Sequence, residues 1–265
     1  MFGFPKKDKS EGFQFKRNFL KSVVFQVKYD KNNDLLQKKE LLISILKDEF
    51  PNNKEIQQVG VGFTLKGDKT PIIHSEQREN NGFQFSSKSN DKLLLIQTDS
   101  LTLTITGNVY QNFSILEKEI EKINKIFEKC NINTFNRIAI RKSNFIEYTP
   151  QQTNNSSVSS LDILPELLNH VLVANSQECP AYEHQKEGVS KMIFIKDGYT
   201  LNLQYGVIRT MTPLVNALFL DIDLFSTEKN VERDKLAEIL GKVNDEIFNV
   251  FSWAITDKLE NILNN

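Results

Sequence analysis

The thirty residues from Asp234 to Leu263, close to the C-terminal end, carry the strongest pattern in the sequence. From Asp234 to Leu263, apolar residues return at three-, four- or five-residue steps, and most charged residues fall outside that stripe. This spacing predicts one long amphipathic helix, which includes the only tryptophan, Trp253. A helix of this length needs a large surface to cover, and a β-sheet is the simplest one. The stripe consists of Leu236, Leu240, Val243, Ile247, Phe251, Ala254 and Leu259.

Several stretches before that helix alternate apolar and polar residues with the period of two that strands show. The clearest is Leu101–Thr106, in which the leucines and Ile105 are expected to face inward and the threonines outward. One further helix is predicted to begin at Ser114, with Glu117 in capping-box spacing, and to end at 130. The other helices are predicted at 35–50 and 161–173, and the strands at 19–29, 55–65, 83–96, 101–106, 135–148, 184–195, 199–208 and 217–225.

The order of these predicted elements repeats. A strand, a helix, three strands and a helix occupy 19–130, and the same order returns in 135–263. We therefore predict an α+β fold made by duplication of a β-α-β-β-β-α unit, with an antiparallel sheet or sheets and helices on one face. The two halves would be related by a pseudo-twofold axis. The predicted boundaries are a basic tail at 1–18, halves at 19–134 and 135–265, and a polar connector near 150–160.

Composition limits the classes of partner. The formal net charge is -1, which argues against a general nucleic-acid binder. The lysine-rich N-terminal tail is the segment through which nucleic acid could still be contacted. Cys130 and Cys179 are too few for a disulfide framework and favour a reduced, cytoplasmic protein. No apolar run approaches the roughly eighteen residues that a membrane helix needs, so we expect no membrane contact.

Motifs for catalysis or cofactor binding do not stand out. The chain has no Gly-rich phosphate loop with a following Lys-Ser or Lys-Thr, no dinucleotide fingerprint and no nucleophile elbow. His74, His170 and His184 are isolated from one another, and neither cysteine has a neighbouring metal ligand. We therefore predict no catalytic residue, no metal site and no cofactor, while an enzymatic activity stays open.

Four charged residues on two predicted strands are the candidate ligand-binding residues. Asp221 and Asp223 lie two positions apart and point to the same strand face, where they could hold a cation with a third carboxylate or form the polar face of an amphipathic strand. Arg137 and Arg141 share a face in the same way and could receive a phosphate or carboxylate. The competing interpretation, which we favour, is that the arginines pair with the two aspartates across neighbouring strands.

Three aromatic residues are candidates for a partner interface. Trp253 lies in the middle of the predicted C-terminal helix, where it either seals that helix against the sheet or contacts a partner. Phe2 and Phe4 lie at the tip of the basic tail and could be a partner-binding hook. The favoured alternative for both phenylalanines is that the tail packs on its own domain.

Five groups of residues along the chain form a recognisable set. They are Val24-Phe25-Gln26, Leu95-Ile96-Gln97 with Leu101 and Leu103, Arg137-Ile138-Ala139-Ile140-Arg141 with Asn144, Leu220-Asp221-Ile222-Asp223, and Phe251, Trp253, Ile255, Thr256 and Leu259. In this order and spacing the chain resembles a sporadically distributed family of uncharacterised prokaryotic proteins of about this length. The likeness runs over nearly the whole chain and is most specific in the C-terminal helix, which carries the pattern F-x-W-x-I-T-x-x-L. Where the family has an aromatic and an aliphatic residue after the second arginine, this chain has Lys142 and Ser143. The resemblance implies an accessory gene carried patchily among bacteria, as toxin–antitoxin and phage-defence components are, and it implies no particular activity.

Three functions are compatible with these observations. The first is a non-catalytic interaction protein of a mobile prokaryotic system, which binds a protein partner, or forms a homo-oligomer, through a groove of the sheet or through the terminal helix. The second is a sensor that binds a small anion or a nucleotide between the halves on Arg137 and Arg141. The third is a metal-dependent hydrolase built on Asp221 and Asp223. The missing catalytic motifs favour the first.

Overall fold

The computed structural model describes residues 1–6, 15–16, 19–65, 71–147, 164–173, 187–209 and 216–264. Its main feature is a nine-stranded sheet with the strand order β2-β3-β4-β5-β1-β7-β10-β9-β8. The strands are β1 (Leu20–Lys28), β2 (Asn52–Leu65), β3 (Pro71–Ser86), β4 (Lys92–Gln97), β5 (Ser100–Thr106), β7 (Arg137–Glu147), β8 (Gly188–Lys196), β9 (Tyr199–Arg209) and β10 (Asn216–Ser226). A small second sheet pairs β6 (Thr134–Phe135) with β11 (Val231–Glu232). The α+β class and the antiparallel sheet are therefore confirmed.

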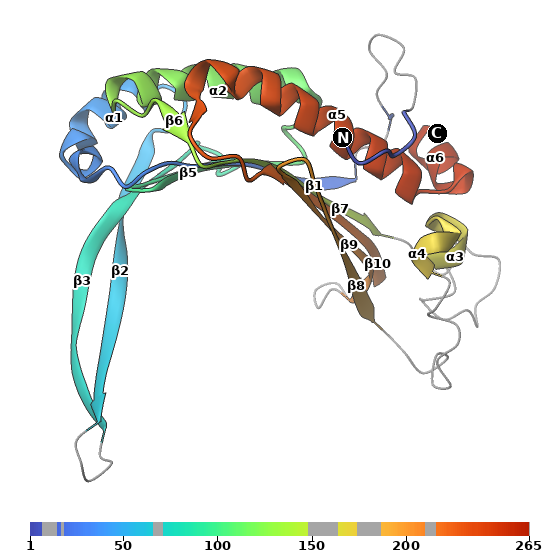
Figure 1. Ribbon diagram of the computed structural model, residues 1–265, viewed down its shortest axis with the longest axis horizontal. Helices are drawn as coiled ribbons and strands as arrows, with labels where there is room; N and C mark the ends of the chain where they lie inside the picture. The colour runs from blue at the N-terminus through green and yellow to red at the C-terminus, as the bar shows by residue number, and fades with distance from the viewer. Residues whose placement is uncertain are drawn as a thin grey trace.

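The helices gather on one face of the large sheet, as predicted. Figure 1 shows α1, α2 and α5 along that face, while the end of the sheet that carries β8, β9 and β10 curves away from them. In chain order the helical elements are η1 (Asn33–Lys38), α1 (Lys39–Leu46), α2 (Phe113–Lys129), α3 (Leu164–Leu167), α4 (His170–Val173), η5 (Arg233–Lys235), α5 (Leu236–Ala254) and α6 (Asp257–Asn264). The opposite face, which we call the open face, is covered by none of the helices in the described part of the chain.

The core lies between the sheet and the helices because each strand buries every second side chain. In β1 the buried residues alternate with half-buried ones such as Val24 and Gln26. α5 buries one stripe and exposes the other side, which matches the periodicity of its sequence. The members of the core on these elements include Val23, Phe25, Val27, Leu101, Leu103, Ile105, Leu116, Ile120, Leu240, Val243 and Ile247.

The two halves of the chain meet at the centre of the sheet. β1 pairs with β5 of its own half and with β7 of the second half, both antiparallel. Phe25 stands opposite Leu103 on one side and opposite Ile140 on the other, and all three are fully buried. One continuous sheet therefore runs through both halves, and the boundary between them is a pair of hydrogen-bonded strands.

The predicted strand at 83–96 is two strands. β3 ends at Ser86 and β4 begins at Lys92, and a tight turn joins them in which Asn90 has a φ of 57°. The Ser87 N–H donates to the Lys92 carbonyl at 3.0 Å, which closes the turn. Asparagine tolerates this left-handed conformation better than other residues that carry a side chain. The first half thus has four strands after its helix, so the predicted three-strand unit is wrong there, and duplication stays a prediction.

The long C-terminal helix is found but is shorter than predicted. α5 ends at Ala254, because Ile255 is extended (ψ 154°) and forms an isolated bridge with Leu168. The Thr256 N–H donates to the Leu167 carbonyl at 3.0 Å, and its hydroxyl donates to the Glu166 carbonyl at 2.6 Å. The chain therefore leaves the helix to pair with the α3 segment and resumes as α6.

Two other boundaries differ from the prediction. The N-cap of α2 is Asn112, whose side chain accepts from the Ser114 N–H at 3.1 Å, so Ser114 is not the cap. The helix predicted at 161–173 is the pair of short helices α3 and α4 within the described residues. The predicted connector near 150–160, Cys179, His184 and most of the basic tail lie outside the described residues.

Thr256 provides a test of the break between α5 and α6. Its hydroxyl donates to the Glu166 carbonyl and accepts from the Leu259 N–H at 3.4 Å, as an N-cap does. Thr256→Ala should lower the free energy of unfolding by about 1 kcal/mol in urea titrations followed by tryptophan fluorescence. Thr256→Ser, which keeps the hydroxyl, should lose much less. Equal stability of the two variants would show that the hydroxyl does not hold the break.

Candidate functional site

The open face carries the four predicted charged residues in neighbouring rows. β7 and β10 are adjacent, and Asp223 stands opposite Arg141 while Asp221 stands opposite Ser143. Here a row means the residues that stand opposite one another on successive strands, and each row runs across the sheet in both directions from β7 and β10. One row contains Leu93, Thr104, Val24, Arg141, Asp223, Asn202 and Ile193.

Asp221 is the buried anchor of this group. Its side chain is 1% exposed, and it accepts from the Arg141 Nε at 2.8 Å and 3.1 Å through its two carboxylate oxygens. The Ser143 hydroxyl donates to the same carboxylate. The hydrogen bond to Asp221 raises the pKa of Arg141 above its ordinary value. The Arg141 side chain is 49% exposed, so a buried carboxylate holds a half-exposed arginine.

Arg137 forms a second pair, in which the arginine is less exposed than Arg141 and the aspartate is more exposed than Asp221. Its Nη2 lies 3.6 Å from the Asp223 carboxylate, and its guanidinium carbon lies 3.6 Å from the centre of the Phe225 ring. Asn202 also donates to Asp223, at 3.2 Å. Burial lowers the pKa of Arg137, and the charge of Asp223 opposes that effect. The Nε of Arg137 is buried and has no hydrogen-bond partner among the described residues.

The predicted cross-strand pairing of the arginines with the aspartates is therefore confirmed. Each arginine of β7 contacts one aspartate of β10, and the pairs help to hold these two strands in register. Both aspartates are engaged by cations, and within the described residues no group of three His, Cys, Asp or Glu side chains is placed to hold a metal ion. Binding of an anion by these arginines stays a prediction.

The three predicted aromatic residues meet at the other side of the sheet. The ring centres of Phe4 and Trp253 are 5.0 Å apart, and Phe4 and Phe2 lie 5.8 Å and 6.4 Å from Phe194 of β8. The Phe2 N–H donates to Glu246 of α5 at 2.6 Å. The N-terminal residues thus pack on their own domain, which was the favoured alternative, and a partner role for these rings stays a prediction.

β8 exposes aliphatic residues that were not predicted from the sequence. Val189, Ile193 and Ile195 are 48%, 56% and 77% exposed, and they lie on the open face because they alternate with Met192 and Phe194. β8 is the last strand of the sheet. The signal in the sequence was the unbroken apolar run from 192 to 195, which gives a strand two apolar faces where only one can be covered.

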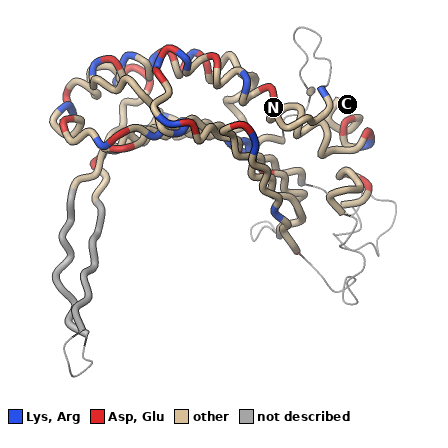
Figure 2. Tube along the Cα trace, viewed as in Figure 1, with Lys and Arg blue, Asp and Glu red and all other residues tan. Residues whose placement is uncertain are grey.

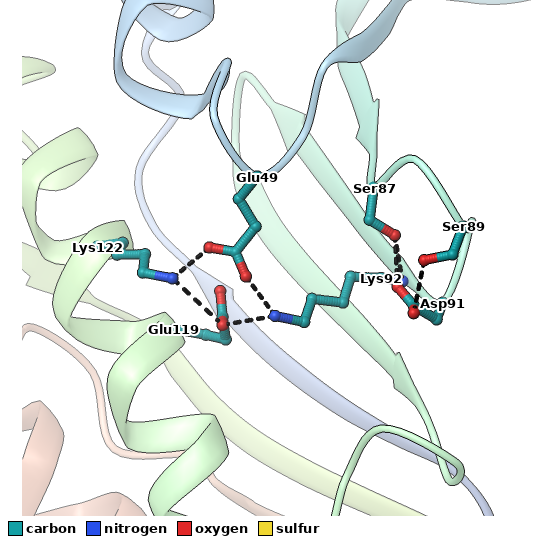
Figure 3. Close-up of polar contacts among 7 residues, drawn as sticks. All are labelled: Glu49, Ser87, Ser89, Asp91, Lys92, Glu119 and Lys122. Carbon is teal, nitrogen blue, oxygen red and sulfur yellow. Dashed lines mark hydrogen bonds and ion pairs between the residues drawn. The ribbon is translucent and has the colours of Figure 1, made fainter.

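A second group of charges, which the sequence did not reveal, links α2 to β4 and the turn after α1 (Figure 3). Lys92 donates to Glu49 and, at 2.8 Å, to Glu119, while Lys122 donates to Glu49 and lies 3.5 Å from Glu119. Burial alone would raise the pKa of Glu49, but the hydrogen bonds from the two lysines lower it to about 2. Burial raises the pKa of Glu119. These residues line a surface cavity of about 650 Å³, and their charges are satisfied by one another.

Another cavity, of about 660 Å³, lies between α2 and the beginning of α5. Asn124 and Arg233 both line it, and the Asn124 Oδ1 and one Arg233 Nη are buried without a hydrogen-bond partner among the described residues. Carboxylates and cations both contribute to its wall. The residues that complete the lining are Lys125, Glu128, Asn133, Thr134, Glu232, Asp234 and Ala237.

No protein-family model matches the chain, and no curated protein matches it. None of the helices in the described ranges has the length and the hydropathy that crossing a bilayer requires. Figure 2 shows that positively and negatively charged residues are interleaved along the helices, while few of the described residues at the β8 end of the sheet are charged. A functional assignment therefore depends on the geometry of the open face and the cavities.

Asp221 and Asp223 should differ in their contribution to stability. Asp221→Asn keeps the size of a fully buried side chain but removes the charge that Arg141 and Ser143 contact, so the free energy of unfolding should fall by about 2 kcal/mol. Asp223→Asn, at a side chain that is 21% exposed, should lose less than about 1 kcal/mol. Chemical denaturation measures both, and equal losses would contradict the assignment of Asp221 as the anchor.

Glu49 should make the fold sensitive to acid. Because its folded-state pKa is lowered from 4.5 to about 2, its stabilising effect is complete above pH 4.5 and is lost as the pH falls toward 2. Glu49→Gln should therefore lose less stability over that interval than the parent chain, as measured by denaturation midpoints at a series of pH values. Glu128→Gln, at an exposed position of the same α2, is the control.

Glu119 should change the stability of the fold in the opposite direction as the pH falls. Its raised pKa means that protonation favours the folded state as the pH falls. We therefore compare two further chains, Glu119→Gln alone and Glu119→Gln with Glu49→Gln. The chain that keeps Glu49 should still lose more stability between pH 4.5 and 2 than the double variant. A difference that disappears in that background would assign the acid sensitivity to Glu119 and contradict the role of Glu49.

Proposed function

We propose that this chain is a non-catalytic interaction protein that binds a protein partner on the open face of its sheet. The observation that carries the proposal is the open face itself, since the described helices near the sheet centre all lie on the other side. An antiparallel sheet can expose one face to water, but that face is then usually polar. Here it also carries apolar side chains among the polar ones, on strands from β4 to β8.

These apolar side chains lie among polar ones that could set the orientation of a partner. Val24 and Leu95 are half-buried on the first half, and Phe219 stands beside Phe145 on the second, with ring centres 5.2 Å apart. Ile193, on the last strand, is more than half exposed. Contiguous exposed apolar surface with a polar surround is typical of protein interaction sites. The Arg141 guanidinium, held by Asp221, adds a fixed charge in the middle of this surface.

The biological setting that we propose is a cytoplasmic, mobile prokaryotic accessory system of the toxin–antitoxin or phage-defence type. The support for this part is the resemblance carried by the C-terminal motif around Trp253, together with the absence of a catalytic motif in the sequence. We also propose that the halves arose by duplication, which the similar placement of β1 and β7 at the centre of the sheet supports.

The partner can be detected by native mass spectrometry of the tagged chain, purified intact from its own host. The expected result is an added mass in the kilodalton range. Val24→Glu together with Leu95→Glu should abolish that mass, because both substitutions place a charge on the open face. Lys118→Glu, on the exposed side of α2, should leave it unchanged. A bare chain in every preparation, or equal loss in all variants, would overturn the proposal.

A second candidate is a sensor of a small polar molecule, and the cavity between α2 and α5 favours it. Asn124 and Arg233 both line the cavity, and each also has one buried polar atom without a hydrogen-bond partner among the described residues. Buried polar groups are normally paired, so this wall of the cavity favours a polar ligand. Residues from both halves line this cavity, and Arg137 and Arg141 are not among them.

Thermal-shift measurements with panels of amino acids and nucleotides would test the sensor. A ligand should raise the melting temperature of the parent chain and should fail to do so with Arg233→Gln. Arg141→Gln is the control, since Arg141 lies on the open face. If the stabilisation is lost with Arg141→Gln and kept with Arg233→Gln, the ligand binds at the open face and the cavity has no such role.

A further inference from the structure

The outer edge of β8 offers backbone hydrogen-bonding groups that no described strand uses. β8 runs for nine residues and pairs with β9 alone, because it is the last strand in the sheet order. Every second residue of an edge strand directs its N–H and C=O away from the sheet. These groups form a template on which a further strand can pair.

The side chains of β8 do little to protect this edge. Proteins usually guard an edge with proline, a bulge, a short strand or several charges. On the open face β8 has exposed Val189, Ile193 and Ile195, and Lys191 is the one charged side chain among them. No described residue pairs with the Lys191 ammonium. The edge therefore combines backbone groups that no described strand pairs with and an aliphatic row that a single positive charge interrupts.

The other face of β8 is held in place. Phe194 packs edge-on against Phe2 and Phe4, and Phe4 contacts Trp253 of α5. The N-terminal residues thus clamp the strand to the helix layer. A strand fixed in this way loses little conformational freedom when another strand pairs with it, so less of the binding free energy is lost to ordering.

We propose that β8 accepts an extended segment of the partner as a tenth, antiparallel strand of the sheet. This inference rests on the proposed function and names the chemistry of the partner. The segment has aliphatic side chains opposite Val189, Ile193 and Ile195 and a carboxylate opposite Lys191. The antiparallel direction continues the pattern of all pairings that the large sheet shows.

A second copy of the chain fits this edge less well. Antiparallel pairing of two β8 strands over their full length places Met192 opposite itself and Lys191 opposite Ile193. Lys191 and Lys196 of both copies then enter one interface, and no residue from 188 to 196 supplies a carboxylate. Like charges close together across strands are destabilising. An acidic, aliphatic segment from another protein removes that repulsion.

The proposal can be tested with the full chain and a labelled synthetic peptide, Thr-Ile-Thr-Val-Thr-Glu-Thr-Val-Thr. Paired antiparallel with β8, this peptide places Ile opposite Ile195, Val opposite Ile193 and Val189, and Glu opposite Lys191. Fluorescence anisotropy should show saturable binding. Ile193→Lys together with Ile195→Lys should weaken it at least tenfold, while Val171→Lys, at a position that is 51% exposed on α4, should not.

A charge exchange and a backbone control make the test specific. Lys191→Glu should weaken binding of the peptide. A second peptide, in which Lys replaces Glu, should bind the Lys191→Glu chain and so restore the interaction. A peptide methylated on alternate backbone nitrogens should not bind, since it cannot form the strand ladder. The proposal would be overturned if Ile193→Lys and Ile195→Lys left the affinity for the peptide unchanged. It would also be overturned if sedimentation showed that the chain associates with itself and does not bind the peptide.

Failure here can be told apart from failure of the proposed function. If the partner from the host still adds its mass to the Ile193→Lys and Ile195→Lys chain, but not to the Val24→Glu and Leu95→Glu chain, the open face binds a partner and β8 does not. If the parent chain and both double variants all lack a partner, the proposed function fails as well.

Discussion

The pairing of β1 with β7 is the interaction on which the rest of the structure depends. These two strands join the halves of the chain, and they hold Phe25 and Ile140 opposite each other in the core. An antiparallel ladder has a period of two, so a shift by one residue would move every buried side chain to the open face. The register of this one pair therefore decides which residues of both halves reach the helices and which remain outside.

The same register brings the charged residues together. Once β7 lies between β1 and β10, Arg141 and Asp221 fall within hydrogen-bonding distance, although 80 positions separate them in the chain. Ser143 and Asn202 then complete the contacts of the two aspartates. The open face is thus polar and well paired at its centre and becomes aliphatic toward β8, where no further strand follows. This gradient is the physical basis for placing a partner there.

Much of the fold could be predicted because it follows from local periodicity. The strand at Leu101–Thr106 and the stripe of α5 show their buried faces in the sequence itself. Boundaries were predicted less well where a contact with a distant segment outweighed the local pattern. The helix predicted through Ile255 ends at Ala254, since Leu168 offers the chain a different hydrogen-bond partner. The pairing of Arg141 with Asp221 could be proposed from strand faces, but the network of Glu49 and Lys92 could not.

The sequence by itself determined the α+β class, the inward faces of the strands and the same-face position of the arginines and aspartates. These properties depend on periodicity and need no knowledge of the neighbours. Only the tertiary structure decided which strand lies at the edge and which face the helices leave uncovered. Both depend on the order of strands in space, and strand order is set by pairings between distant residues. The exposure of Ile193 and Ile195 is a consequence of that order, so the site proposed on β8 emerges only in the folded chain.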